Sequence, residues 1–426
     1  MTSTTADFVV IGAGVIGVTV ASELKRRHPG ATVLVLEKEA APGLHASGRN
    51  SGVLHAGFYY TADSLKARFT RIGNQRMREY CESRGLRLNR CGKLVVARDE
   101  SELEGLAELL RRGHQNSVVL EEVDERAARR IEPRVKTHRK ALYSPQTFTV
   151  DPAEVMRSLT ADAEHLGVGF RYGTRCLGQG GGALETTGGR IGFGYTVNAA
   201  GLYADRIARH FGFSRRYRIL PFKGLYLYSS EPPGGFRTNI YPVPNLRNPF
   251  LGVHFTVTVD GRSKIGPTAI PCLWREQYGW SENFQMSEFV QILADGLGLL
   301  VHAGFDFRSL AVEELRKIHR RHLVAQASAL ATGVRAADYV RWGPPGIRAQ
   351  LFDVEKKTLV QDFWLEGDER SLHVLNAVSP AWTCAFPFSE FVCDEVDRRM
   401  GRGGFAVSAP ESSASVTDSR SATRPR

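Results

Sequence analysis

Three glycines near the start of the chain are the first residues whose spacing could do chemistry. Residues 8–17 read FVVIGAGVIG, an apolar run followed by Gly12, Gly14 and Gly17. In this GxGxxG spacing the first glycine permits a tight turn, the second lets the backbone approach a pyrophosphate, and the third lets a helix pack closely on a strand. The predicted chemistry is the binding of a dinucleotide.

A strand, a helix and a second strand must position that turn. The apolar run before it predicts a buried strand, and Val15 and Ile16 open a helix whose free N–H groups face the phosphates. A second apolar run, residues 32–36, ends in Glu37, which stands where an acid accepts hydrogen bonds from ribose hydroxyls. The fingerprint alone fits NAD and FAD equally.

The bulk composition bounds the class of protein. The 426 residues exceed one typical domain, so two interlocked domains are expected. With 42% hydrophobic residues the chain reads as globular, and its longest apolar stretches, such as residues 296–301, are far too short to span a bilayer. The first residues predict neither a signal peptide nor a transit peptide. The six cysteines have no ligand-like spacing, which favours reduced thiols in the cytoplasm and no metal site.

The formal net charge of +11 is the most unusual bulk property. No basic–aromatic repeat or Arg/Lys-rich helix accompanies it, so nucleic-acid binding is not expected. Three interpretations remain open: a cationic pocket for an anionic substrate, attraction to an anionic membrane surface, and an arginine-rich composition without function. The expected location is the cytoplasm, with peripheral attachment to the inner face of the cell membrane left open.

Three features favour FAD over NAD. The fingerprint lies at the extreme N-terminus, and Ala21 and Leu24 extend it in a way common in flavoproteins. Residues 45–60, HASGRNSGVLHAGFYY, resemble the flavin-contacting segment of the D-amino-acid-oxidase-like superfamily, and the NAAG turn at 198–201 resembles its second flavin-binding motif. The resemblance implies further cofactor-binding residues, namely Lys38, His45, Asn50, Ser51, Gly52, Ala200, Gly201, Ser379, Pro380 and Thr383.

Within that superfamily the chain most closely resembles the L-2-hydroxyglutarate dehydrogenase/oxidase family. The matching blocks follow the family's order from residue 8 to about residue 400. They are NSGVLHAGFYY and SLKARF (50–69), CGKLVVA (91–97), GLYADRIA (201–208), PFKG (221–224), YPVP (241–244), PFLGVHFT (249–256), IGP (265–267), GIRAQ (346–350) and NAVSPAWT (376–383). The resemblance implies FAD-dependent oxidation of a dicarboxylic hydroxy acid, L-2-hydroxyglutarate, to 2-oxoglutarate.

The sequence departs from the family's pattern at four places. Arg49 stands where the family usually has a second histidine, and Leu225 ends a Lys-Gly-Leu run where it has Arg-Gly-Glu. Val378 replaces a proline, and Trp382 stands where small residues are usual. Lysine keeps the charge of arginine but loses the planar fork that grips a carboxylate. Oxidation of another 2-hydroxy acid or of an amino acid therefore stays an alternative.

The implied reaction moves a hydride from Cα to the flavin and a hydroxyl proton to a base. A neutral histidine suits the second task because its pKa lies near the working pH. We assign the base to His254 and the orientation of flavin or substrate to His55; for His254 the alternative is a structural histidine between apolar strands. His45 could contact the flavin, with or without a covalent bond, or be a simple loop residue.

The carboxylates of such a substrate need cations or several hydrogen-bond donors. Arg348 is the main candidate, for catalysis as well as binding, since little else explains an arginine in the GIRAQ segment. Weaker candidates are Lys223, Tyr241, Tyr59 and Tyr60. For each of these tyrosines, packing in a half-buried sheet is the alternative. Lys66 and Arg68 are expected to solvate a helix face or to meet the FAD phosphates.

The expected fold class is α/β, a Rossmann-like FAD domain with an interleaved, β-rich α+β substrate domain. The FAD domain is expected to take residues 6–90, 151–215 and 346–400, and the substrate domain residues 91–150 and 216–345. Residues 401–426 are Gly-, Ser- and Arg-rich and are expected to form a disordered tail. Helices are expected at 64–85, 99–114, 124–131, 152–166, 286–340 and 388–400.

A flavin-binding module without turnover is the alternative from another functional class, and His254 and Arg348 argue against it. The electron acceptor stays open between a membrane quinone, oxygen and an electron-transfer protein. The sequence says nothing about the oligomeric state.

Overall fold

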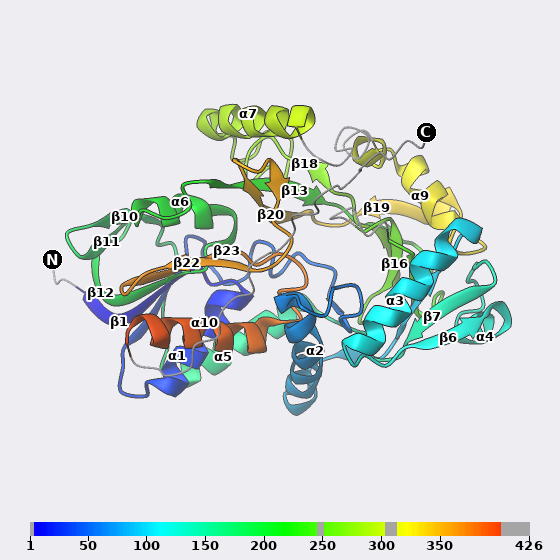
Figure 1. Cartoon of the computed structure of the whole chain (residues 1–426), viewed down its shortest axis with the longest axis horizontal. Coiled ribbons are helices and arrows are strands. Elements are labelled where there is room, and N and C mark those ends of the chain that lie inside the picture. Colours follow the sequence, from blue (N-terminus) through cyan, green and yellow to red (C-terminus); the bar gives the residue numbers. More distant parts are fainter. Residues whose placement is uncertain (1–3, 245–250, 303–312, 402–426) are drawn as a thin grey trace, which may run out of the picture.

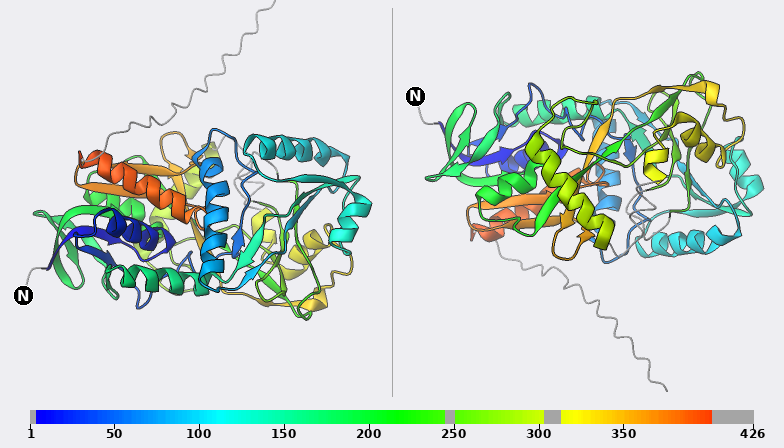
Figure 2. Two further views of the ribbon diagram at one scale, coloured as in Figure 1. Left: turned by 90° about the horizontal axis from the view of Figure 1, so that it is seen from below. Right: turned by 90° about the horizontal axis from the view of Figure 1, so that it is seen from above.

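The chain folds into two lobes with helix α2 (Leu65–Ser83) crossing between them (Figures 1 and 2). This computed structural model describes residues 4–244, 251–302 and 313–401. All but the first residue of the expected tail at 401–426 lies outside the described residues.

The first lobe is built on an eight-stranded mixed sheet. Strand β1 (Thr4–Ile11) runs parallel to β2 (Val33–Leu36) on one side and to β12 (Gly189–Asn198) on the other. The sheet is completed by β9 (Gly169–Arg171), β10 (Cys176–Gly180), β11 (Ala183–Thr186), β22 (Trp364–Gly367) and β23 (Ser371–Asn376). The carboxyl ends of the parallel strands meet at one edge, where a ligand site is expected.

Helices cover both faces of this sheet (Figure 1). Phe8 and Val10 pack with α1 (Val15–Arg27), α5 (Pro152–His165) and α10 (Ala385–Arg399), while Val9 and Ile11 face α6 (Ala204–His210). This alternation is the period-2 pattern of a strand buried on both sides. Helix α10 begins at residue 385, slightly before the predicted start at 388.

The second lobe contains another eight-stranded sheet. In order across the sheet, its strands are β19 (Tyr339–Trp342), β14 (Leu227–Ser229), β17 (Ser263–Gly266), β16 (His254–Val257), β15 (Asn239–Pro242), β5 (Lys93–Val96), β7 (Lys140–Ser144) and β6 (Glu121–Asp124). Helices α3 (Leu103–Gln115), α4 (Glu125–Ile131) and α9 (Arg320–Ser328) pack on it.

The two faces of this second sheet differ in chemistry. Ile240 lies opposite Phe255, and both belong to an apolar core shared with α9. Because side chains alternate along a strand, the neighbouring Tyr241 and His254 lie on the opposite face. Lys93 also belongs to that face, one residue before a member of the apolar core. The fold therefore gathers polar side chains on one side of the sheet.

A four-stranded sheet connects the lobes. Strand β13 (Tyr217–Gly224) pairs along its whole length with β20 (Gly346–Asp353), and β18 (Ile270–Pro271) and β21 (Thr358–Leu359) flank them. A small sheet pairs β8 (Phe148–Val150) with β3 (Val53–Leu54) and β4 (Leu88–Asn89). Strand pairing thus crosses the domain limits expected at 345/346 and 150/151, which remain predictions.

The region expected to be helical at 286–340 is helical only in part. It contains helices α7 (Met286–His302) and α9 and the short 3-10 turn η3 (Ala336–Asp338). Two further 3-10 turns, η1 (Glu100–Glu102) and η2 (Gly201–Tyr203), lie elsewhere in the chain. Residues 339–342 form a strand instead, because β19 pairs with β14 and buries Tyr339. Helix α7 runs along the outer surface (Figure 2). Across the described segments, no helix has the length and apolar character needed to span a membrane.

Candidate active site

A cavity of about 570 Å³ lies between the lobes. Its wall takes Gly12, Gly14 and Glu37 from the first lobe, and it takes Tyr241 and His254 from the second. The loops that follow the parallel strands therefore share one space with the polar face of the second sheet. This is the edge at which the topology predicts a ligand.

The glycine turn has the geometry that a dinucleotide needs. Gly12 has φ +104°, and a Cβ there would lie 2.7 Å from the Ala199 carbonyl oxygen. A Cβ on Gly17 would lie 1.8 Å from the Gly12 oxygen, so Gly17 serves helix packing rather than the cavity wall. A Cβ on Gly14 meets only the Ser47 hydroxyl within 4 Å, at 3.1 Å. Gly14 therefore leaves open a cradle at the cavity wall beside the start of α1.

The start of α1 remains suited to an anion. Val15 and Ile16 line the cavity, and the first turn of the helix contains no acidic residue. The N–H of Val15 donates to the hydroxyl of Ser47, a residue not singled out from the sequence. The positive end of the helix dipole thus faces the space where a pyrophosphate would lie.

Glu37 is held at the cavity by the backbone. Its carboxylate accepts hydrogen bonds from the N–H of Ala13, at 2.8 Å, and of Glu39, at 2.9 Å. It is 8% exposed and lines the cavity. A carboxylate fixed in this way still has lone pairs to accept from ribose hydroxyls.

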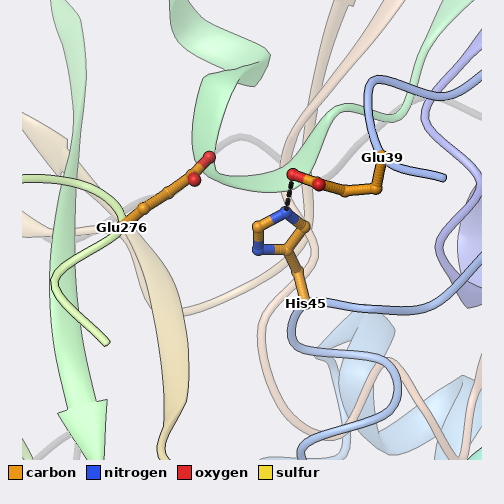
Figure 3. A group of neighbouring side chains, drawn as sticks. All are labelled: Glu39, His45 and Glu276. Atoms are coloured by element: carbon orange, nitrogen blue, oxygen red, sulfur yellow. Dashed lines mark hydrogen bonds and ion pairs between the residues drawn. The ribbon is translucent and has the colours of Figure 1, made fainter. Parts of the chain in front are cut away.

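Glu39, His45 and Glu276 form a group that could hold a metal ion (Figure 3). Lys38 already supplies a cation there: its Nζ lies 2.7 Å from Glu276 and 2.9 Å from His45 Nε2, and it also pairs with Glu39. His45 Nε2 lies 3.0 Å from Glu39, and Nδ1 lies 2.6 Å from the Tyr278 hydroxyl. We assign no metal to this group, because the lysine satisfies the same oxygens and nitrogen.

Two loops join to form the next part of the wall. The Thr383 hydroxyl accepts from the N–H of His55 at 3.1 Å, which ties the loop before α10 to the segment after residue 50. Gly52 has φ +76° and packs against the Val150 carbonyl rather than lining the cavity. Other predicted cofactor residues do line it, namely Lys38, His45, Asn50, Ser51, Ala200, Gly201, Ser379, Pro380 and Thr383.

His254 is oriented by a stack and a hydrogen bond. Its ring lies on the Tyr241 ring with centroids 3.7 Å apart and planes 15° apart. Nδ1 lies 2.9 Å from the Gly252 carbonyl, so Nδ1 carries the proton and Nε2 keeps its lone pair. Burial lowers the pKa of His254 to about 3, which leaves the imidazole neutral over the physiological range.

His55 and Arg348 lie on the same cavity. Burial, together with the charges of Lys93 and His254, lowers the pKa of His55 well below its usual value. Burial also lowers the pKa of Arg348, to about 10, so the guanidinium stays charged at neutral pH. Its Nε donates to the side chain of Gln350 at 3.2 Å. The cavity thus combines two neutral imidazoles with a guanidinium.

Several predicted site residues do not line the cavity. Because side chains alternate along strand β13, Phe222 and Gly224 line the cavity and Lys223 does not. The Nζ of Lys223 instead donates to the Tyr278 carbonyl at 3.3 Å. Tyr59 and Tyr60 lie behind the wall. Lys66 was expected to solvate a helix face or meet phosphates; it is 5% exposed and lies over the rings of Tyr60 and Phe363, while Arg68 is exposed.

Lys93 is a buried cation beside the cavity that the sequence analysis missed. Its Nζ lies 4.6 Å from the centre of the Tyr241 ring, and its charge acts on both His55 and His254. The available sequence feature was a lysine in the otherwise apolar GKLVVA strand. Trp382, noted only as a departure from the family, also lines the cavity.

A glycine turn, an acid after the second strand, a neutral histidine and a buried arginine around one cavity are the features expected of a dinucleotide-dependent oxidoreductase. Residues 7–387 match the family described as DAO, FAD dependent oxidoreductase. The chain belongs to this family and is an FAD-dependent oxidoreductase. The predicted α/β fold class and the predicted cofactor, FAD, are confirmed.

The chain is similar along its length to curated enzymes. It is 36% identical to the mitochondrial L-2-hydroxyglutarate dehydrogenase of Nematostella vectensis, over 92% of this chain and 91% of that one. It is 34% identical to the mitochondrial enzyme of that name from Homo sapiens, over 92% and 89% of the two chains. The Escherichia coli K12 L-2-hydroxyglutarate dehydrogenase is 32% identical over 92% and 93%. The resemblance stated from the motif blocks is confirmed.

Solved structures share the fold. The L-alpha-glycerophosphate oxidase of Mycoplasma pneumoniae, with FAD bound, superimposes with a TM-score of 0.73 at 19% identity, covering 92% of this chain and 95% of that one. The glycine oxidase of Geobacillus kaustophilus superimposes with a TM-score of 0.69 at 19% identity, covering 93% and 96%. The chain therefore shares its fold with these two oxidases.

Proposed function

We propose that this protein oxidises L-2-hydroxyglutarate to 2-oxoglutarate. The observation that carries the proposal is the position of His254 and Arg348 on one cavity with the glycine turn: an unprotonated imidazole nitrogen and a guanidinium share the space that the dinucleotide fingerprint opens. The three curated relatives described above, all named L-2-hydroxyglutarate dehydrogenase, support the choice of substrate.

In the reaction the Cα hydrogen leaves with two electrons, the hydroxyl group loses a proton, and the Cα–O bond becomes a carbonyl. Bound FAD supplies the acceptor for that hydride. Arg348 binds a substrate carboxylate by charge-assisted hydrogen bonds and so fixes Cα. His254 accepts the hydroxyl proton at Nε2, and the negative charge of the bound substrate favours the imidazolium that forms.

The cofactor-binding residues hold FAD in three ways. The cradle at Gly14 and the start of α1 would hold the pyrophosphate, and Glu37 would accept hydrogen bonds from the ribose hydroxyls. Residues 379–383 lie directly before α10, whose N-terminal dipole favours negative charge on the reduced cofactor. Mass spectrometry of the denatured protein would distinguish covalent from non-covalent FAD, because only covalently bound FAD adds its mass to that of the chain.

The rival substrates and the module without turnover receive less support. Leu225 does not line the cavity, so this departure from the family does not reshape the wall directly. Trp382 does line it, and its Nε1–H has no acceptor among the described residues. That N–H is a donor suited to a carboxylate or to the cofactor, which fits an anionic substrate.

We also propose a quinone at an anionic membrane surface as the electron acceptor, with oxygen as the alternative. Around the start of α7, Trp280 is 95% exposed, and Met286, Val290 and Leu293 are exposed as well. Together with the net charge of +11, this apolar surface suits the interface of an anionic bilayer. Flotation with phosphatidylglycerol vesicles tests the membrane contact: Trp280→Ser lowers the bound fraction if the proposal holds, and equal binding contradicts it. Reoxidation of the substrate-reduced protein by a quinone, compared with reoxidation by oxygen, tests the acceptor.

The first experiment is anaerobic mixing of the purified yellow protein with L-2-hydroxyglutarate, with the D-enantiomer, lactate, malate and glutamate as controls. Bleaching of the flavin band by the L-enantiomer alone is the expected result. Bleaching by another compound would reassign the substrate. A band that none of them bleaches would favour the module without turnover.

A further inference from the structure

Lys93 is a buried ammonium with no anionic partner in the part of the chain that the structure describes. The residue is 0% exposed, and Nζ has no hydrogen-bond partner among the described residues. Its neighbours are aromatic: Nζ lies 4.6 Å from the ring centre of Tyr241, 4.8 Å from that of Tyr59 and 5.0 Å from that of Phe58. Ring faces offset only part of the cost of burying a charge.

One of the tyrosines whose rings surround Lys93 Nζ also has an unsatisfied polar atom. The hydroxyl of Tyr59 is buried and has no hydrogen-bond partner among the described residues. An ammonium has three donors and no acceptor, and a phenol hydroxyl can donate one hydrogen bond. An ammonium and a nearby tyrosine hydroxyl that both lack a partner in the described part of the chain predict an acceptor, and the positive charge predicts that this acceptor is an anion.

The position of Lys93 relates this pair to the reaction. Although the Tyr241 ring lies beside Lys93, the charge of Lys93 still acts on both histidines and lowers the pKa of His55 and of His254. Tyr241, His55 and His254 all line the cavity. The ammonium therefore lies behind the part of the cavity wall that these three residues form, on a flexible stem that a change of rotamer can redirect toward the cavity.

A matched lysine on the same sheet face is different. Lys264 is 5% exposed, and its Nζ lies 4.5 Å from the Tyr226 ring centre. The charges of Asp260 and Asp151 act on Lys264, whereas none of the described carboxylates acts on Lys93. The missing anion is therefore specific to Lys93.

We propose that Lys93 and Tyr59 form the subsite for the second carboxylate of the substrate, the one remote from the reacting carbon. The inference rests on the proposed function and deepens it, because it explains how a dicarboxylate is preferred over a monocarboxylate. Arg348 binds the carboxylate next to Cα, and Lys93 with Tyr59 binds the other. Specificity then comes from two cationic positions at opposite ends of one short chain.

The test compares substrates that differ only in that carboxylate. Anaerobic reduction of the holoenzyme by L-2-hydroxyglutarate is compared with reduction by L-2-hydroxypentanoate, in which a methyl group ends the chain. In Lys93→Met we expect kcat/KM for the dicarboxylate to fall by about 100-fold, mainly through KM, with less than about a threefold change for the monocarboxylate. Tyr59→Phe should give a smaller selective loss, of about tenfold. Equal losses on both substrates would overturn the proposal.

Lys264→Met is the matched control, and it should leave the ratio between the two substrates unchanged. Lys93→Arg should restore part of the selectivity, because it returns the charge in a different shape. A Lys264→Met variant that loses the same selectivity would mean that charge on the sheet face, not a subsite, sets the preference, and this also overturns the proposal.

A binding measurement separates this inference from the proposed function. Glutarate and pentanoate lack the hydroxyl group and cannot be oxidised, so their affinity is read from the perturbed flavin spectrum without turnover. Wild type should bind glutarate more tightly than pentanoate, and Lys93→Met and Tyr59→Phe should lose that difference. If L-2-hydroxyglutarate does not bleach the flavin but this pattern appears, the function fails and the subsite stands. If bleaching occurs without this pattern, the subsite fails alone.

Discussion

The ring of His254 stacks on the ring of Tyr241 with their centroids 3.7 Å apart. The two residues lie on adjacent antiparallel strands, β16 and β15, one position from the pair of Ile240 and Phe255 that anchors both strands in the core. The stack and the hydrogen bond to Gly252 together fix the plane and the tautomer of the imidazole. The reactive nitrogen is therefore positioned by the sheet before any substrate binds.

Replacement of His254 by asparagine tests the assigned base. Without an imidazole to take the hydroxyl proton, we expect the rate of flavin reduction to fall by about 10²–10⁴-fold, with FAD still bound. Stopped-flow absorbance of the flavin band measures the rate. His114→Asn, on the exposed surface of α3, is the control and should match wild type. If the rate of flavin reduction fell by less than tenfold, His254 would be a structural residue rather than the base.

The pH dependence of kcat/KM reports the same group in the free enzyme. The base works only when unprotonated, and burial lowers the pKa of His254 to about 3, so its protonation removes activity only as the pH falls toward that value. We expect no acidic limb from this residue between pH 5 and pH 8. An ordinary histidine would instead place a limb near about pH 6.5. A limb at that pH, lost in His254→Asn, would contradict the neutral, buried imidazole.

The glycines of the turn should separate folding from cofactor binding. Gly14→Ala introduces a Cβ that meets only the Ser47 hydroxyl, so the protein should fold with nearly wild-type stability while its FAD affinity falls at least about tenfold. Gly17→Ala places a Cβ 1.8 Å from the Gly12 oxygen and should prevent stable folding. Thermal unfolding and the quenching of FAD fluorescence on binding measure the two properties. If Gly14→Ala bound FAD as tightly as wild type, the assignment of the space beside Gly14 to the pyrophosphate would be wrong.

The subsite lysine should lower the stability of the ligand-free protein. Burial lowers the pKa of Lys93 from 10.5 to about 7, so between these values the folded state binds fewer protons than the unfolded state, and stability rises with pH. Below about pH 7 the penalty is fully present. Lys93→Met should therefore be more stable than wild type at pH 7, by about 1–4 kcal/mol, although its affinity for glutarate is lost. Urea unfolding of both proteins at pH 7 and pH 10 checks the prediction: the stability advantage of Lys93→Met over wild type should be present at pH 7 and smaller at pH 10.

The sequence predicted the first lobe better than the second because its elements carry local rules. The spacing of Gly12, Gly14 and Gly17, the acid at Glu37 and the Asp151 cap of α5 each follow from short-range geometry. They could be predicted without knowing what packs against them.

The substrate side depends on strand register, which the sequence does not display. Whether Lys223 or its neighbours face the cavity is decided by the pairing of β13 with β20, and the structure turns Lys223 away. Lys93 was missed because a lysine at the start of an apolar strand usually reaches solvent; here aromatic residues from distant segments enclose it. His254 and Arg348 line the cavity through sheet contacts that only the fold reveals, and their assigned roles stay predictions.

A buried ion pair between Arg275 and Asp205 lies behind the part of the cavity wall that residues 200–203 form. Arg275 and Asp205 are both 0% exposed and make two parallel bonds, at 2.7 and 2.8 Å, and Arg275 also donates to the Leu202 carbonyl. Asp205 lies in α6, directly after residues 200–203, which line the cavity. The pair therefore ties the second flavin-binding turn to the segment that follows β18.

Breaking one partner of that pair should cost more than replacing both. Asp205→Asn leaves the Arg275 charge buried without its carboxylate, so we expect a loss of about 3–5 kcal/mol in the free energy of unfolding, together with weaker FAD binding. The double variant Asp205→Leu with Arg275→Met removes both charges and should recover at least about half of that loss. Denaturant unfolding of the FAD-free proteins measures the energies, and FAD titration measures the effect on the wall. If the double variant is as unstable as Asp205→Asn, the geometry of the bidentate pair, rather than its unpaired charge, sets the cost.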